Sequence, residues 1–229
     1  MTEEKKTAVS ARRKFLTGAA AATGAAALGA PMIAKAQSPI VIKMQGSWSA
    51  TDIFNEMAVE FVKRVNDMSG GRLRVDYLVG GSVVKPFEVM DAVSKGVLDA
   101  GHTVPVYWYG KSKVASLFGS GPINGCDAHQ TLAWIYRGGG LDMYKELLGK
   151  LNLNVVGFFA MPMPTQPLGW FKKPITDASQ IKGLKYRTVG LAADLMQEMG
   201  AKVTQLPGGE IIPALERGVI DAFEFNNPT

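Results

Sequence analysis

Apolar residues recur along this chain at two spacings. Segments with the spacing of a strand alternate with segments that have the spacing of a helix. A strand-like period predicts strands over residues 39–45, 73–79, 97–104 and 153–160. A helix-like period predicts helices over 53–65, from Pro86 onward, over 128–137 and over 141–150. Strands that alternate with helices predict a parallel sheet with right-handed crossovers, and therefore an α/β fold.

A second series of the same kind follows a proline-rich stretch. It predicts strands over 184–188, 202–206 and 219–225, with helices over 191–199 and 210–217 between them. Pro162 and Pro164 suit a crossing of the chain between two lobes. We therefore assign residues 37–161 to a first α/β lobe and residues 162–229 to a second, incomplete one. Because only four residues follow the strand Val219–Phe225, we expect a chain truncated at its C-terminus.

A nine-residue unit occurs once in each series. Residues 92–100 read AVSKGVLDA and residues 214–222 read ALERGVIDA. Gly96 and Gly218 stand where a helix ends with positive φ, a conformation that glycine adopts without steric cost. The repeat favours two similarly built lobes, which could enclose a small ligand, although it could also be ordinary α/β construction.

The first 36 residues have the pattern of an export signal. Arg12, Arg13 and Lys14 precede a run of mostly small residues, and Ala34-Lys35-Ala36 forms a cleavage site before Gln37. The segment Arg12–Leu16 also matches the twin-arginine pattern RRxFL, and the alternative is a general secretory signal. Export without a lipid-anchor cysteine predicts a periplasmic protein, since the single Cys126 is far from the cleavage site.

Charge and metal-ligand content exclude several classes of protein. The whole chain has a net charge of +5, but residues 1–36 carry +4 of it, so the mature part carries only +1. A net charge so close to zero does not indicate a basic surface that binds nucleic acid. One cysteine and two widely spaced histidines, His102 and His129, do not form a zinc site.

Polar and aromatic side chains gather at the carboxyl ends of the predicted strands, where open parallel sheets bind their ligands. Arg187 offers a planar fork for a carboxylate, or is simply a surface arginine. Glu224, between two phenylalanines, must be paired, must coordinate a cation or must lie at the surface. Gln166 has oxygen and nitrogen atoms suited to a cation or a ligand. The remaining candidates at these ends are Trp48, Tyr107, Tyr109 and Asn227, and the aromatic ones could equally serve in packing.

Catalytic motifs are missing from the sequence. The chain has no GxSxG motif, and Pro105 stands where a phosphate loop before Gly110-Lys111-Ser112 needs its first glycine. The sequence therefore favours binding over chemistry. Two alternatives stay open, an exported α/β enzyme that uses Glu224 or Asp221 with His102, and a ligand-sensing domain.

Several segments together resemble one family, the solute-binding proteins of TRAP (tripartite ATP-independent periplasmic) transporters. They are AVSKGVLDAGHT, Pro164-Thr165-Gln166, FKKPITDASQIKGLK, Tyr186-Arg187-Thr188 and GGEIIPALERGVIDAFEFNNPT. Within the family, the chain looks most similar to the members that bind 2-oxo acids and lactate with the help of a metal ion.

The resemblance implies a fold and a set of roles. It implies the two-lobed architecture of periplasmic binding proteins, with mostly parallel sheets and a ligand cleft between the lobes. Arg187 would grip the carboxylate of a small organic acid. Gln166, the Glu224 carboxylate and the Phe225 carbonyl would hold a metal ion, and oxygen ligands suit Na⁺ or Ca²⁺. Phe225 replaces the tryptophan of some relatives.

The same resemblance implies the context in which the protein acts. It would deliver its ligand to the membrane subunits of a TRAP transporter, would use no organic cofactor and would catalyse no reaction. It also allows a homodimer.

Overall fold

The computed structural model describes residues 38–119, 126–161, 163 and 166–226. The predicted export signal, residues 1–36, and the candidate ligand residue Asn227 lie outside this part of the chain. Within the described residues, no helix is long and apolar enough to cross a membrane.

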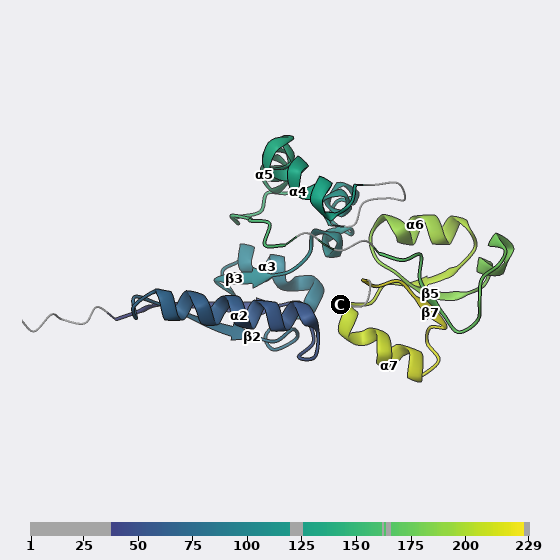
Figure 1. The fold of residues 1–229 in the computed structure, drawn as a ribbon, viewed down its shortest axis with the longest axis horizontal. Helices are drawn as coiled ribbons and strands as arrows, with labels where there is room; N and C mark the ends of the chain where they lie inside the picture. The colour runs from purple at the N-terminus through teal and green to yellow at the C-terminus, as the bar shows by residue number, and fades with distance from the viewer. Residues whose placement is uncertain (1–37, 120–125, 162, 164–165, 227–229) are drawn as a thin grey trace, which may run out of the picture. The chain divides into compact units, whose positions relative to one another are not determined.

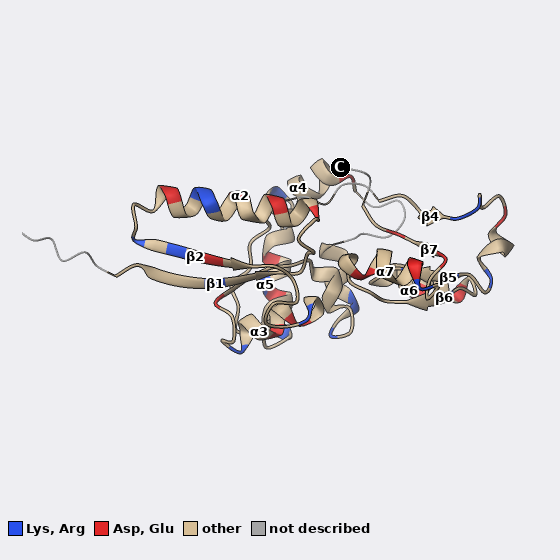
Figure 2. Ribbon diagram, turned by 90° about the horizontal axis from the view of Figure 1, so that it is seen from below, with Lys and Arg blue, Asp and Glu red and all other residues tan. Residues whose placement is uncertain are grey.

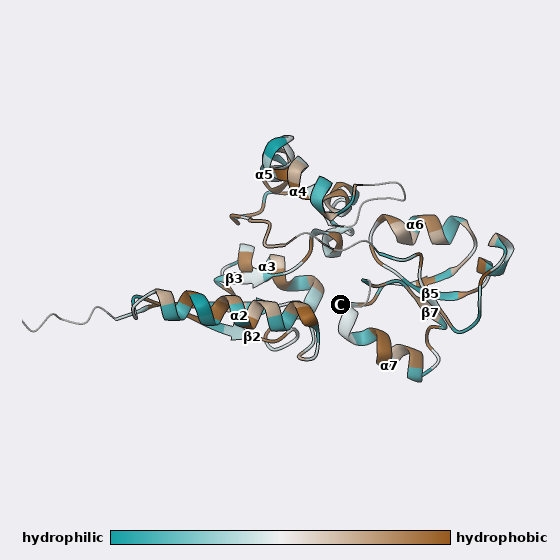
Figure 3. Cartoon of the chain, in the orientation of Figure 1, coloured by the Kyte–Doolittle hydropathy of each residue, from teal (hydrophilic) through white to brown (hydrophobic). Residues whose placement is uncertain are grey.

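The first series forms a three-stranded parallel sheet, as predicted. Its strands are β1 (Ile40–Gly46), β2 (Leu73–Leu78) and β3 (Ala100–His102), in the order β2-β1-β3. Helix α2 (Ile53–Met68) connects β1 to β2 and lies along them in Figures 1 and 2. Brown and teal residues alternate along α2 in Figure 3. Phe54, Ala58 and Val62 are buried, whereas the apolar Met57 and Phe61 are 46 % and 58 % exposed. The short 3₁₀ helix η1 (Pro86–Glu88) and helix α3 (Val89–Ser94) connect β2 to β3.

The two copies of the repeated unit adopt the same conformation. Gly96 has φ +73° and Gly218 has φ +68°, as expected. In the first copy the amides of Val97 and Leu98 both donate to Ala92 O, at 2.8 and 3.2 Å. In the second copy, Val219 and Ile220 donate to Ala214 O in the same way, at 2.9 and 3.4 Å. The predicted strands 97–104 and 219–225 therefore begin later than their apolar patterns suggested, because the chain first curls back onto the preceding helix.

The middle of the chain contains helices, followed by a segment that the sequence predicted to be a strand. The 3₁₀ helices η2 (Pro105–Trp108) and η3 (Lys113–Phe118) precede α4 (Ala128–Arg137) and α5 (Gly140–Lys150). The predicted strand 153–160 is wrong, because the segment forms no ladder with any strand of the described residues. Its alternation is nevertheless real. Leu153, Val155 and Phe159 pack on a cluster that includes Tyr144, whereas Val156 and Phe158 are 83 % and 85 % exposed.

The second series forms a four-stranded sheet in the order β4-β7-β5-β6. Its strands are β4 (Trp170–Phe171), β5 (Lys185–Arg187), β6 (Lys202–Thr204) and β7 (Ala222–Phe223). All pairs are parallel except β4 with β7, and β4 was not predicted.

Helices cover both faces of this second sheet. Figure 1 shows α6 (Leu191–Glu198) on one side of β5 and β7 and α7 (Ile211–Glu216) on the other. The short 3₁₀ helices η4 (Ala178–Ile181) and η5 (Gly208–Glu210) complete the series. The predicted α/β fold with mostly parallel sheets is confirmed, whereas the lobe boundaries 37–161 and 162–229 stay a prediction.

Candidate ligand-binding site

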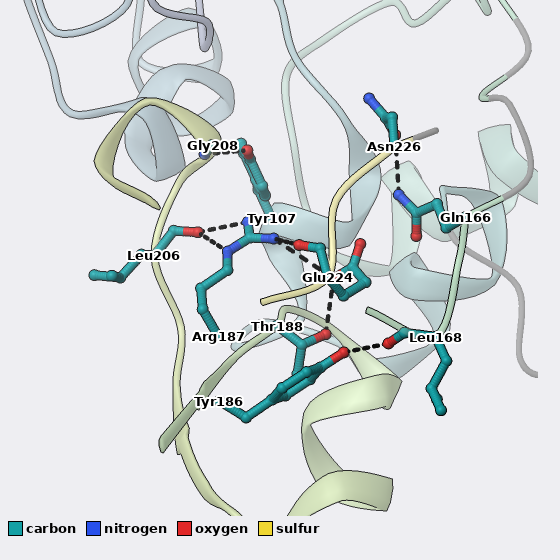
Figure 4. A network of polar contacts seen from close by, with 10 residues as sticks. All are labelled: Tyr107, Gln166, Leu168, Tyr186, Arg187, Thr188, Leu206, Gly208, Glu224 and Asn226. Carbon is teal, nitrogen blue, oxygen red and sulfur yellow. Dashed lines mark hydrogen bonds and ion pairs between the residues drawn. The ribbon is translucent and has the colours of Figure 1, made fainter. Parts of the chain in front are cut away.

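Arg187 ends strand β5 and is almost fully buried, with 1 % of its surface exposed. Its Nε and Nη2 atoms both donate to Leu206 O, at 2.8 and 2.6 Å, and Nη1 donates to Glu224 O at 2.7 Å. The parallel pairing of β5 with β7 places the Glu224 carbonyl there, because Arg187 lies opposite Phe223 in the register. Two main-chain oxygens, from the segments that follow β6 and β7, thus hold the plane of the guanidinium (Figure 4).

The Glu224 carboxylate lies beside this guanidinium and is also buried, at 8 % exposure. Its Oε2 accepts a hydrogen bond from Thr188 Oγ1 at 2.9 Å and lies 3.5 Å from Arg187 Nη1. Burial raises the pKa of the Glu224 carboxyl, and Arg187 and Thr188 offset part of that rise. The pair is therefore a loose one, in which Arg187 is held mainly by carbonyl oxygens rather than by the carboxylate.

Arg187 keeps hydrogen-bonding capacity beyond these contacts. A guanidinium has five N–H groups, and four of them are used by the bonds from Nε and Nη2 to Leu206 O and from Nη1 to Glu224 O and, at 3.5 Å, to Glu224 Oε2. One N–H of Nη2 has no acceptor among the described residues, and the bond from Nη1 to Glu224 Oε2 is long. A ligand carboxylate that replaced this long bond would contact both atoms in two-point fashion. A positive charge that is buried, oriented and only partly used suits the capture of an anion.

The aromatic residues Phe225 and Tyr107 lie near Arg187. The Phe225 ring lies 5.8 Å from the Arg187 guanidinium carbon, measured to the ring centre. It also packs so closely on Gly208 that a Cβ there would lie 2.7 Å from a ring carbon. The amide of Gly208 donates to the Tyr107 hydroxyl at 3.3 Å, and burial raises the pKa of that tyrosine. Tyr107 is thereby brought to the network from a segment 80 residues before Arg187.

Gln166 reaches the same strand end. Its Nε2 donates to Asn226 Oδ1 at 3.0 Å, and Asn226 follows Glu224 by two residues. The structure therefore gathers five of the predicted site residues. They are Tyr107, Gln166, Arg187, Glu224 and Phe225.

Trp48 and Tyr109 have other partners. Trp48 is buried in a cluster with Phe54, and its indole N–H donates to His102 Nδ1 at 2.9 Å. The Tyr109 hydroxyl donates to the carboxylate of Asp194, which also pairs with Lys113 at 2.7 Å. Their polar atoms are thus engaged away from Arg187, although the Trp48 ring lies 6.1 Å from that of Tyr107.

The enzyme alternative would need Glu224 or Asp221 to act with His102, but His102 and Asp221 have other partners. His102 accepts from Trp48, and burial lowers its pKa. Asp221 pairs with Lys172 at 3.2 Å on the surface. In the described residues neither one joins the network of Glu224.

Three contributors were not predicted from the sequence, namely the Thr188 hydroxyl, the Leu206 carbonyl and Asn226. Every residue has a main-chain carbonyl, so the sequence does not indicate which carbonyl will bind a side chain. Asn226 did have a signal, because it stands two residues after Glu224 and shares the same face of an extended chain.

A hollow of about 450 Å³ opens next to this network, and Phe225 belongs to both. Its other lining residues come from the loop after β1 and from the start of α2; they are Ser49, Thr51, Asp52, Ile53 and Glu56. Among the residues that the structure describes, no group of three His, Cys, Asp or Glu side chains could hold a metal ion. A cation bound to Glu224 would need amide and carbonyl oxygens as its other protein ligands.

Comparison with known families decides what kind of protein carries this site. The family model of bacterial extracellular solute-binding proteins, family 7, matches residues 44–229. The chain belongs to this family. Its members are solute-binding receptors rather than enzymes, and they act outside the cytoplasm.

Similar proteins of the family give more detail. A monocarboxylate 2-oxoacid-binding periplasmic protein of Nostoc sp. is 37 % identical over 223 residues, which are 95 % of this chain and 60 % of that protein. A TRAP transporter solute-binding protein from Bordetella bronchiseptica superposes with a TM-score of 0.77 at 33 % identity, over 84 % of this chain and 56 % of that one. Its crystal structure is a dimer with copurified calcium and picolinate.

A third relative, from Pseudoalteromonas atlantica, has sodium and pyruvate bound. It gives a TM-score of 0.71 at 30 % identity, over 83 % of this chain and 57 % of that one. The chain thus spans somewhat over half the length of the relatives it matches.

Proposed function

We propose that this protein captures a small 2-oxo or 2-hydroxy monocarboxylate, such as pyruvate or lactate, together with Na⁺ or Ca²⁺. It delivers that acid to the membrane subunits of a TRAP transporter and catalyses no reaction. The observation that carries the proposal is the buried Arg187, whose guanidinium is held by two carbonyl oxygens and keeps one Nη2 N–H without an acceptor among the described residues. The bound acids named for the relatives from Nostoc and Pseudoalteromonas support the ligand class.

Arg187 would bind the carboxylate of the ligand. Because Leu206 O and Glu224 O already orient the guanidinium, little conformational freedom is lost when the ligand arrives. Tyr107 would close the site on one side, held by Gly208. Trp48, Tyr109 and Asn227 remain predicted ligand contacts.

The donor set beside Arg187 fits a hard cation. The Glu224 carboxylate, the Gln166 amide and the Phe225 carbonyl all offer oxygen, and Gln166 is tied to the segment after Glu224 through Asn226. Burial raises the pKa of Glu224, which means that its charge is poorly compensated by the protein alone. A bound cation would supply that compensation and would attract the ligand carboxylate.

Affinity for pyruvate is therefore expected to depend on the cation. Glu224→Gln should lower calcium affinity and pyruvate affinity together, each by about tenfold or more, because linkage makes their coupling reciprocal. The measurement is calorimetric titration of metal-stripped, full-length protein with pyruvate, with and without Ca²⁺ or Na⁺. Glu216→Gln, at an exposed position, is the matched control. Equal pyruvate affinity with and without added ion would show that Glu224 is structural.

The pH dependence gives the same prediction a second readout. The pKa of Glu224 is raised in the folded protein, so the folded state favours the protonated carboxyl. Without metal, the contribution of Glu224 to stability is greatest at low pH and declines as pH rises through that raised pKa. Calcium affinity should change in the opposite sense and fall as the carboxyl takes up its proton.

Export by the twin-arginine route is a separate part of the proposal. Replacing Arg12 and Arg13 with lysine keeps the charge of the signal but removes the RRxFL pattern. The double variant should leave unprocessed precursor in the cytoplasm, as measured by fractionation and immunoblotting. Normal processing would indicate the general secretory route.

A further inference from the structure

Asn226 lies on the buried side of the extended segment that runs from β7 to the candidate site. Alternate residues of the run after Gly218 are buried on this face: Ile220, Ala222, Glu224 and Asn226. The first two are apolar and belong to the core, whereas the last two are polar. Residues two apart in an extended chain lie roughly 7 Å from each other on one face. Asn226 is therefore the next side chain beyond the Glu224 carboxylate.

The amide of Asn226 is held at one end only. Its Oδ1 accepts from Gln166 Nε2, whereas its Nδ2 is buried and has no hydrogen-bond partner among the residues that the structure describes. The residue is 6 % exposed, so water does not readily replace the missing acceptor. Figure 4 shows this nitrogen pointing away from Gln166. A buried donor without a partner is costly and uncommon in native proteins, and it requires an explanation.

Gln166 also determines which way the amide faces. While Gln166 presents Nε2, a flip of Asn226 alone would bring its NH₂ group against the NH₂ group of Gln166, and two donors cannot bond each other. In this arrangement Nδ2 is a donor at the strand end that carries Glu224, and the neighbouring Phe225 ring lies beside Arg187. An acceptor that arrives with the ligand would satisfy this donor.

We propose that Asn226 Nδ2 donates to the oxygen on carbon 2 of the bound acid and thereby selects 2-oxo and 2-hydroxy acids over plain monocarboxylates. The inference rests on the proposed function and deepens it. Arg187 accounts for the carboxylate, which every monocarboxylate has, so Arg187 cannot distinguish these acids. A site that donates a hydrogen bond to a ligand oxygen rejects an analogue without that oxygen, because its own donor then stays unpaired. Keto and hydroxyl oxygens both accept such a bond.

The test compares pyruvate with propionate, which has the same carbon skeleton but no oxygen on carbon 2. Full-length protein with saturating Ca²⁺ is titrated with each acid by calorimetry. The wild type should prefer pyruvate. In Asn226→Ala, the ratio of the two affinities should fall by about tenfold, the effect of one lost hydrogen bond, and propionate affinity should change little. Asn154→Ala, at an exposed asparagine, is the matched control and should leave the ratio unchanged.

A second variant separates this role from an indirect one through Gln166. Asn226→Asp keeps an oxygen that accepts from Gln166 Nε2 but replaces the donor with another oxygen. It should lower pyruvate affinity at least as much as Asn226→Ala. Thermal unfolding without ligand checks that both variants fold.

The outcomes are distinguishable from failure of the proposed function. An unchanged pyruvate-to-propionate ratio in folded Asn226→Ala would overturn the role of Asn226 alone. Equal losses for both acids would also overturn it, since Asn226 would then act only by positioning Gln166. A wild-type protein that binds neither acid would refute the proposed ligand class and this inference with it.

Discussion

Arg187→Lys is expected to abolish most of the ligand affinity and to destabilise the fold as well. Lysine keeps the charge, but an ammonium on a flexible stem cannot reproduce the planar fork. In the wild type, Arg187 donates to Leu206 O, to Glu224 O and, in our proposal, to the ligand carboxylate. Losing the two-point contact with a carboxylate should cost about 1.5–3 kcal/mol, which is roughly a 10- to 100-fold loss of affinity.

Stability should fall for a different reason. The lysine can satisfy one of the two carbonyl oxygens, so the other stays buried without a donor, and the Glu224 carboxylate loses part of its compensation. Each effect costs about 1–3 kcal/mol, so a total near 3 kcal/mol is expected.

Calorimetry with pyruvate and urea unfolding of the same preparation measure the two losses separately. Arg217→Lys, at an exposed position after helix α7, serves as the control for both. Wild-type affinity in a folded Arg187→Lys protein would mean that the ligand carboxylate binds elsewhere.

Gly190→Ala is expected to be the most destabilising small substitution in the described chain. Gly190 precedes α6 with φ +69° and ψ −147°, a region open almost only to glycine. An added Cβ would lie 2.3 Å from Val106 Cγ2 and 2.9 Å from Ser116 Oγ. Both neighbours are buried, and the χ1 angle of valine is stiff, so neither can move aside cheaply. Strain and overpacking, at about 1–3 kcal/mol each, should together cost about 4 kcal/mol.

Gly218→Ala isolates the contribution of packing. Gly218 has a nearly equal φ of +68°, but a Cβ there would meet nothing within 4 Å. Its alanine variant should lose only the conformational cost, about 1–2 kcal/mol. Urea unfolding of the two variants gives the difference. Similar losses for both would show that the contact of Gly190 with Val106 and Ser116 relaxes freely.

The sequence alone was enough to predict the helices and the class of fold. Apolar periodicity located α2, α4, α5 and α6 to within a few residues, because a helix is stabilised by local hydrogen bonds and one apolar stripe. The repeated glycine unit was also readable, since positive φ is a local property of the backbone. Strand lengths were overestimated for the opposite reason. A ladder needs a partner strand, and the alternation over 153–160 has none among the described strands.

The candidate site was predictable in its charged members but not in its arrangement. Arg187, Glu224 and Gln166 could be selected from the sequence because strand ends in parallel sheets collect ligand-binding groups. Only the register of β5 against β7 decided that Arg187 bonds the main-chain carbonyl of Glu224 more closely than its carboxylate. The same holds for Trp48, which the sequence placed beside the ligand and whose indole N–H the tertiary fold directs to His102. Residue type and position determine which chemistry is available near a strand end. Which atoms actually meet depends on contacts between segments far apart in the chain, and no local pattern records those contacts.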